Sequence, residues 1–193
     1  MPRQPKNKPT IRPKYIFVEG KTEEIYFNFL KQRMNLQNIK VFLTGSHGIS
    51  LWHKAKEKIK NDPKLMNLKD VDVYLIFDKD QLTQEDFNQV IKFSQDEFFT
   101  LGFSNSAFEV WLLAHFKKVT KKVISPQKLA QDLTVELGLK DKKEGYKKSN
   151  PLQLEKIVQH YKVAITNSAE IATADYDYQC TTLPHVIHRL GND

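Results

Sequence analysis

Acidic residues follow two apolar segments of the chain at the points where these segments end. Glu19 comes directly after Tyr15–Val18, and Asp78 and Asp80 follow the strongest apolar stretch of the sequence. Carboxylate oxygens bind Mg²⁺ and Mn²⁺, which keep water and substrate phosphate oxygens in their remaining positions. Glu23, four residues after Glu19, is a further candidate ligand. We therefore expect one or two ions of Mg²⁺ or Mn²⁺ at these carboxylates.

The residues around Glu19 also contain the letters GKT, which are typical of a phosphate-binding loop. Such a loop needs a first glycine where this sequence has Tyr15, because the backbone must curl around the phosphates. A carboxylate at Glu19 would also repel a phosphate unless a metal ion lay between them. The sequence therefore disfavours a phosphate loop and favours a metal site.

A third interpretation concerns the D-x-D pair of Asp78 and Asp80 alone. In phosphatases of the haloacid dehalogenase type the first aspartate of such a pair is a nucleophile and the second an acid. Those proteins usually have Thr or Val four residues after the first aspartate, where this chain has Leu82. Their motif also follows the first strand of the domain, whereas here two predicted strands precede it. A phosphohydrolase of this kind remains the less favoured alternative.

The elements that position these acids follow from alternating apolar runs and helical periodicities. We predict strands over 15–19, 39–44 and 71–77, and helices over 22–35, 49–60 and 84–98. Strands and helices that alternate through short connections are typical of a mostly parallel, Rossmann-like sheet flanked by helices. The carboxyl ends of parallel strands meet at one edge, where functional groups gather. Glu19 and Asp78 should therefore project from the same edge, and Ser104 should end a fourth strand.

The pattern changes from Lys117 onward to helices and lysine-rich connections. Helices are predicted from Ser125 to Leu139, with Ser125 as the N-cap, and from Pro151 to about Ala174, opened by Asn150. Between them we expect an exposed loop. The chain is therefore predicted to consist of a basic N-terminal arm (1–13), a core (14–116) and a helical, lysine-rich lobe (117–193) in the same compact unit as the core.

Positive charge is concentrated in two segments. The net charge is +7, of which Met1–Lys14 carries +5 and Lys117–Lys148 carries +6, so the remainder sums to −4. This distribution suits a polyanion gripped at the edges and a cation held at the centre. Lysines bind phosphates without reading the sugar, so the pattern fits RNA or DNA. The candidate nucleic-acid contacts are Lys21, Ser104, Lys117, Lys118, Lys121, Lys122, Lys142, Lys143, Lys147 and Lys148.

Composition also bounds the cellular setting. The single cysteine, Cys180, cannot form an internal disulfide or a cysteine-rich zinc cluster. No apolar run is long enough to span a bilayer, so we expect a cytoplasmic protein without a membrane partner. Trp52 and Trp111 are predicted to be packing residues, and His115 a core histidine with a hydrogen-bond partner.

The E-G-x-x-E motif after the first strand, combined with D-x-D after a later one, resembles the Toprim domain of topoisomerases, primases and related nucleases. The sequence is more closely similar to the RloB family, small Toprim-like proteins also known as the AbiLii component of an abortive phage-infection system. The segments that carry this resemblance are Ile16–Leu30, Val73–Asp80 and Phe103–Phe116.

The resemblance implies a metal-dependent nuclease, or a nuclease-like effector, in anti-phage defence, commonly encoded beside an AAA-type ATPase. It assigns Glu19, Asp78 and Asp80 to the acidic triad and Glu23 to the second glutamate of the related nucleases. Glu109 is the candidate for a further acid in a two-ion site, and Lys79 for stabilising charge in the transition state.

Other interpretations stay open. Glu109 lies on the same helix face as apolar residues, so it could instead form a salt bridge or cap a helix. The protein could also be a non-catalytic component that binds nucleic acid or a partner, and a homo-oligomer remains open.

Overall fold

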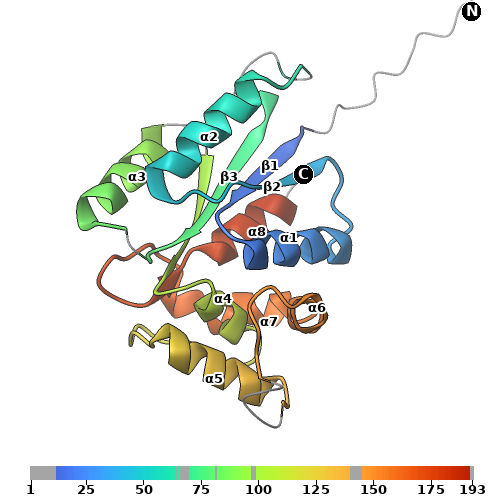
Figure 1. Cartoon of the computed structure of the whole chain (residues 1–193), viewed down its shortest axis with the longest axis vertical. Coiled ribbons are helices and arrows are strands. Elements are labelled where there is room, and N and C mark those ends of the chain that lie inside the picture. Colours follow the sequence, from blue (N-terminus) through green and yellow to red (C-terminus); the bar gives the residue numbers. More distant parts are fainter. Residues whose placement is uncertain are drawn as a thin grey trace, which may run out of the picture.

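The mostly parallel α/β fold that the sequence predicts is confirmed by a computed structural model of the chain (Figure 1). The structure describes residues 12–63, 65, 70–80, 82–96, 99–139 and 145–191. In this part of the chain one sheet contains β1 (Lys14–Val18), β2 (Ile39–Leu43), β3 (Asp72–Asp78), β4 (Phe99–Asn105) and β5 (Cys180–Thr181).

The strands lie in the order β2-β1-β3-β4-β5. Strand β1 pairs in parallel with β2 and β3, and β3 pairs in parallel with β4, whereas β5 is antiparallel to β4. Because β1 and β3 are neighbours, their carboxyl ends lie side by side at one edge. The chain leaving β1 stays attached there, since the backbone N–H of Glu19 donates to the carbonyl of Ile76 at 3.2 Å.

Two helical layers cover the sheet. The helices that alternate with the first strands are α1 (Lys21–Arg33), α2 (Gly48–Lys60) and α3 (Gln84–Asp96). Their bounds and those of β1 to β3 agree with the predicted ranges to within two residues. Figure 1 shows α2 and α3 on one face, and α1 on the other together with the last helix, α8 (Leu183–Gly191).

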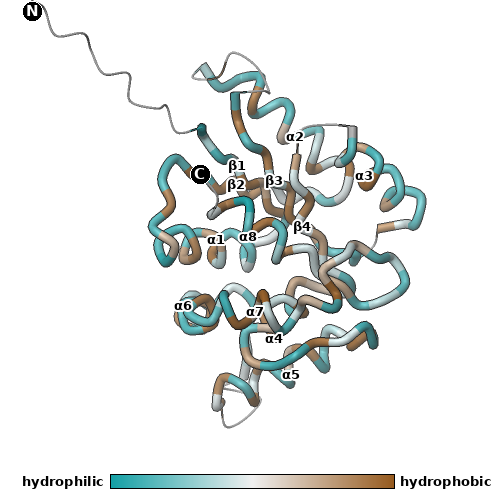
Figure 2. The backbone as a smooth tube through the Cα atoms, turned by 180° about the vertical axis from the view of Figure 1, so that it is seen from behind, coloured by the Kyte–Doolittle hydropathy of each residue, from teal (hydrophilic) through white to brown (hydrophobic). Residues whose placement is uncertain are grey.

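The side chains of each strand alternate between two apolar clusters, as period-two geometry requires. Tyr15 and Phe17 pack with Leu51 and Trp52 of α2, while Ile16 joins the cluster formed by α1 and α8. The hydropathy colours in Figure 2 show largely apolar strands between helices in which polar and apolar residues are mixed. Both tryptophans, Trp52 and Trp111, are buried as predicted.

The segment after the fourth strand packs beneath the carboxyl edge of the sheet in the view of Figure 1. Its elements are α4 (Glu109–Ala114), α5 (Pro126–Glu136), α6 (Pro151–Val158), α7 (Tyr161–Asn167) and the 3₁₀ helix η2 (Ala169–Ile171). Helices α5 and α6 begin where predicted. Ser125 accepts from the N–H of Lys128 at 3.3 Å, and Asn150 accepts from the N–H of Gln153 at 3.2 Å.

One prediction for this segment is wrong. The single helix expected over 151–174 is divided into α6, α7 and η2, which allows α7 to turn and pack against α4. Of the loop expected between α5 and α6, residues 140–144 lie outside the described residues; Lys147 and Lys148 are exposed, whereas Tyr146 is partly buried and reaches the buried Glu109. Strand β5 was not predicted, and it joins the C-terminal segment to the sheet.

Candidate functional site

A pocket of about 420 Å³ lies at the carboxyl edge of the sheet. It is formed where the ends of β1 and β3 meet the starts of α1, α4 and α5 and the loop before α6. Its wall contains four of the predicted metal ligands, of which Asp80 is exposed. The lining residues are Glu19, Gly20, Lys21, Thr22, Glu23, Asp78, Asp80, Ser106, Ala107, Pro126, Lys148 and Ser149.

Gly20 allows the first turn of α1 to approach the pocket closely. A Cβ atom at this position would lie 2.6 Å from Oε2 of Glu23, which is closer than real Cβ contacts allow. The carboxylate of Glu23 therefore folds back over the glycine and is buried, with 6% of the residue exposed. The glycine of the E-G-x-x-E motif thus leaves room for the side chain of the second glutamate.

Glu19 lies at the end of β1, with Oε1 3.9 Å from Nδ1 of His47, which directly precedes α2. Its other oxygen, Oε2, is buried and has no hydrogen-bond partner. Burial raises the pKa of Glu19 above its ordinary value, although His47 and the backbone N–H of Asp78 oppose this shift. The site therefore presents an unsatisfied carboxylate oxygen, which is costly without a cation or a proton.

Asp78 and Glu23 share this unfavourable environment. Burial, followed by the negative charges of Glu23, Glu109 and Glu19, raises the pKa of Asp78 well above its usual range. Burial and the neighbouring Glu109 and Glu19 likewise raise the pKa of Glu23 to about 7. The backbone N–H of Phe108, immediately before α4, partly offsets the shift at Asp78. These carboxylates are close enough to resist ionising together.

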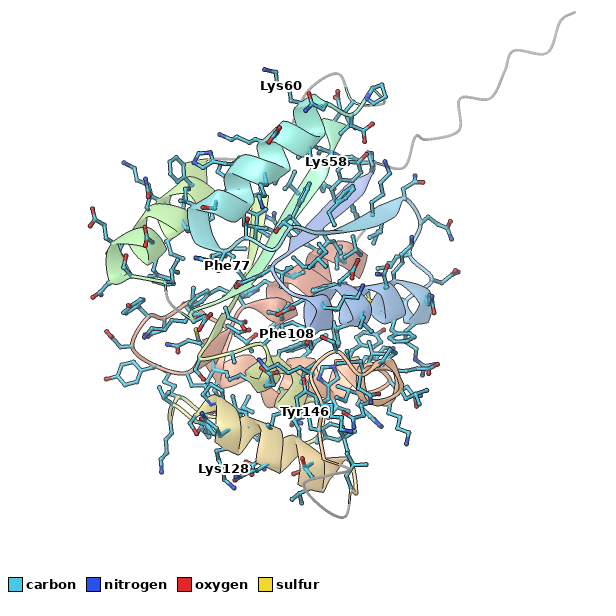
Figure 3. All side chains as sticks on the ribbon, in the orientation of Figure 1. Lys58, Lys60, Phe77, Phe108, Lys128 and Tyr146 are labelled. Atoms are coloured by element: carbon cyan, nitrogen blue, oxygen red, sulfur yellow. The ribbon has the colours of Figure 1, made fainter. Side chains whose placement is uncertain are left out.

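Glu109 stands behind the pocket wall, at the first position of α4. It is buried, and its Oε1 accepts a hydrogen bond from the hydroxyl of Tyr146 at 3.2 Å and lies 3.3 Å from Nζ of Lys148. Its Oε2 is buried without a partner. Figure 3 labels Tyr146, together with Phe108, between the end of the sheet and α5. The salt-bridge interpretation of Glu109 therefore holds, and the structure also brings Glu109 to the other acids.

Lys79 and Ser104 also lie outside the pocket wall. The ammonium of Lys79 donates to the carbonyl of Tyr176 at 2.6 Å and lies 3.8 Å from the centre of that tyrosine ring. Ser104 is buried and its hydroxyl is 3.1 Å from that of Thr181 on β5. Both side chains therefore fasten the C-terminal segment to the sheet in this structure.

The predicted nucleic-acid lysines fall into several groups. Lys117 pairs with Asp132 and Glu136, and Lys118 pairs with Glu170, so these two have local partners. Lys121, Lys122 and Lys147 are exposed. Lys21 lines the pocket and forms an ion pair with Glu24. Lys142 and Lys143 lie outside the described residues.

Three contributors to the site were not predicted. His47 approaches Glu19 after β2, and the rule that places functional groups at the carboxyl ends of strands could have indicated it. Tyr146 gives no comparable signal, since it lies in a lysine-rich connection without periodicity. The third is a contact between α1 and this connection, in which Thr22 accepts from the backbone N–H of Ser149 at 3.1 Å.

The donor set fits a hard divalent cation only in part. Among the described residues no three Asp, Glu, His or Cys side chains are grouped so that they could hold a metal ion as they stand. Mg²⁺, however, commonly uses only one or two carboxylates and completes its shell with water and phosphate oxygens. The unpartnered oxygens of Glu19 and Glu109 are of the kind that such an ion binds. The carboxylates at the pocket are therefore of the chemical type that such an ion binds, but in the described residues they are not grouped to hold it as they stand.

The fold and the site define a mixed α/β protein whose mostly parallel sheet carries an acidic pocket at its carboxyl edge. Residues 14–190 match the family described as RloB-like protein. The chain belongs to this family, as its sequence motifs indicated. Searches of curated proteins and of solved structures found no match. None of the helices in the described ranges is long and apolar enough to cross a membrane.

Proposed function

We propose that this protein is a Mg²⁺- or Mn²⁺-dependent nuclease that hydrolyses phosphodiester bonds of RNA or DNA. The observation that carries the proposal is that Glu19, Glu23 and Asp78 line one pocket with Glu109 behind its wall, and that burial and mutual repulsion raise the pKa of the first three. Acids held in this way at a cleft are typical of functional sites. A bound cation would relieve the repulsion that the fold imposes.

Each residue then has a chemical task. Glu19 and Asp78 would hold the ion from adjacent strand ends, with Asp80 at the accessible side of the pocket. A divalent cation at such a site activates water and stabilises the charge of the leaving oxygen. The side chain of Lys21, exposed at the rim, can bind a phosphate of the substrate. The pocket is open to a polyanion, because lysines flank its acids.

The RloB-like family supports a role in phage defence. The resemblance on which this rests also implies an AAA-type ATPase as the partner. We therefore propose that the protein is the effector of such a system and that the ATPase controls its activity. The cleavage assay is best performed both with and without that ATPase.

A non-catalytic component is the second candidate. The observation in its favour is that Lys148 already compensates Glu109, and that no ready-made group of three metal ligands exists in the described ranges. In that case the acids would form an internal polar network, and the basic surface would bind nucleic acid or a partner.

The phosphohydrolase alternative is disfavoured by the place of Asp78 in the chain. It ends the third strand, whereas the nucleophile of those phosphatases follows the first strand of the domain. Leu82 also stands where they usually have Thr or Val. Turnover of a phosphate monoester that depends on Asp78 would nevertheless restore this alternative.

The test is a cleavage assay with tRNA, plasmid and single-stranded DNA in Mg²⁺ and in Mn²⁺. We expect Asp78→Asn and Glu19→Gln to lower cleavage by roughly a hundredfold or more, because each removes a ligand of the cation that stabilises the transition state. Glu57→Gln removes the same charge from the exposed surface of α2 and should retain activity. Absence of cleavage under every condition, combined with full phage protection by both pocket variants, would refute the nuclease.

A further inference from the structure

Lys148 contacts a buried acid, which a lysine that only binds nucleic acid at the surface would not do. Its backbone belongs to the connection before α6, yet its ammonium lies 3.3 Å from the buried carboxylate of Glu109 and lines the acidic pocket. Glu19, Glu23 and Asp78 line the same pocket as Lys148. One tethered cation therefore faces several acids from different elements.

We propose that Lys148 is a built-in counter-cation, which neutralises the pocket in the metal-free protein and is displaced toward the substrate phosphate when a divalent cation binds. The inference rests on the proposed function, because it assigns a task to Lys148 in the metal-dependent cycle. It differs from a general phosphate contact, since it makes the lysine a competitor of the metal ion.

The attachment of the connection explains how the ammonium is held in place. The backbone N–H of Ser149 donates to the hydroxyl of Thr22 at 3.1 Å, which fixes the chain to the first turn of α1. On the other side of the lysine, the hydroxyl of Tyr146 donates to the same oxygen of Glu109 at 3.2 Å. The lysine is thus anchored at both sides, and its ammonium is aimed at the acids.

The side chain of Lys148 is nevertheless exposed enough to move away from Glu109. The side chain of Lys148 is 66% exposed, whereas that of Glu109 is only 3% exposed. Burial of Glu109 makes a positive partner necessary, because an uncompensated buried charge is strongly destabilising. A divalent cation can supply this charge in place of the lysine. The exposed stem then allows the ammonium to swing outward without disturbing the core.

Displacement of the Lys148 ammonium by the metal ion would also affect the order in which the metal ion and the nucleic acid bind. Two cations that compete for the same carboxylates weaken one another, and the effect is reciprocal. Metal binding would release an ammonium at the pocket mouth, where a phosphate of the substrate can receive it. The pocket would therefore bind the polyanion more strongly once the metal is present.

The experiment measures Mn²⁺ binding to the full chain by isothermal titration calorimetry at pH 8, without nucleic acid. We expect Lys148→Met and Lys148→Gln to bind Mn²⁺ at least about fivefold more tightly than the natural protein, because the competing charge is gone. Lys147→Met is the matched control, since it removes the same charge from the exposed neighbouring position. Lys148→Arg keeps a competing cation and should leave the affinity within about twofold of the natural value.

Thermal unfolding gives a second readout. Without metal, Lys148→Met should melt at a lower temperature than Lys147→Met, because Glu109 loses its positively charged partner, and Mn²⁺ should raise its melting temperature more than that of the control. Equal Mn²⁺ affinities in Lys148→Met, Lys147→Met and the natural protein would overturn the role of Lys148 and leave the nuclease proposal standing. Failure of all variants to bind Mn²⁺ would overturn both.

Discussion

The buried histidine of the core, His115, makes the stability of the folded protein depend on pH. His115 is 2% exposed; its Nε2 is 3.0 Å from the hydroxyl of Tyr26, and its Nδ1 is 2.9 Å from the carbonyl of Trp111. Burial lowers the pKa of His115 to about 3, although the backbone carbonyl of Trp111 favours the charged form. The neutral ring is therefore the form that the folded protein accepts, as expected for a core histidine.

This lowered pKa predicts a loss of stability in acid. The unfolded chain binds a proton at His115 below about pH 6.5, whereas the folded chain does not, so the stabilising contribution is lost as the pH falls from about 6.5 toward 3. When the pH falls from 6.5 to 5, we expect this residue to lower the free energy of unfolding by about 2 kcal/mol. Urea unfolding of the natural protein and of His115→Gln at both pH values measures the difference.

The variant is expected to be less stable at pH 6.5 and to lose less stability on acidification. His53→Gln is the control, because His53 is exposed on α2. Equal acid sensitivity of the natural protein and His115→Gln would contradict the assignment of this shift to His115.

The positions of individual site residues could be predicted from the sequence only where those residues end parallel strands. Glu19 and Asp78 were placed together because they end parallel strands, and the pairing of β1 with β3 makes them neighbours. Lys79 and Ser104 instead contact Tyr176 and Thr181, which belong to the unpredicted C-terminal return of the chain. Such long-range contacts leave no periodic signal in the residues that make them.

The elements differ in how clearly the sequence marks their ends. Ser125 and Asn150, each followed by proline, start α5 and α6 where predicted. The break between α6 and α7 has no such mark, because no glycine or proline lies between residues 152 and 174. Strand β5 has only two residues, which is too short for an alternating pattern. Local chemistry therefore predicted the starts of helices, while tertiary packing decided the break and the last strand.

The cap at Asn150 gives a prediction for an element. Replacing Asn150 with Ala removes the acceptor for the N–H of Gln153 and should lower the free energy of unfolding by about 1 kcal/mol. Leu152→Ala is the matched control on the same helical turn, because Leu152 is 72% exposed and its loss should change stability by less than about 0.5 kcal/mol. Urea titrations followed by circular dichroism measure both values. Equal losses in the two variants would contradict the capping role.

At the scale of the whole molecule, the lysine-rich segment after α4 is not uniformly available to a polyanion. Lys117 and Lys118 are engaged with Asp132, Glu136 and Glu170, and Lys148 faces the acidic pocket. Lys121 and Lys122 are exposed, and no salt bridge to either side chain is found among the described residues. The accessible part of the predicted nucleic-acid surface is therefore narrower than the charge count of the segment suggests.

This difference predicts unequal effects of two double variants on nucleic-acid affinity. Lys121→Ala with Lys122→Ala should weaken binding to duplex DNA and reduce the slope of log K against log salt by up to about 1.8, because each phosphate contact contributes about 0.9. Lys117→Ala with Lys118→Ala removes the same charge but should reduce the slope less. Fluorescence anisotropy at several salt concentrations measures both slopes, and equal reductions would contradict the proposed contact surface.

The two ends of the described chain meet in the core, which has a consequence for the order of folding. The buried Lys14, at the start of β1, donates to the carbonyl of Leu190 near the end of α8, and β5 completes the sheet only after all other strands. Contacts between residues so distant in sequence raise the contact order and slow folding. During synthesis the first strand must therefore wait for the last helix. The sheet that carries the acidic pocket therefore reaches its final packing only after α8 has been synthesised.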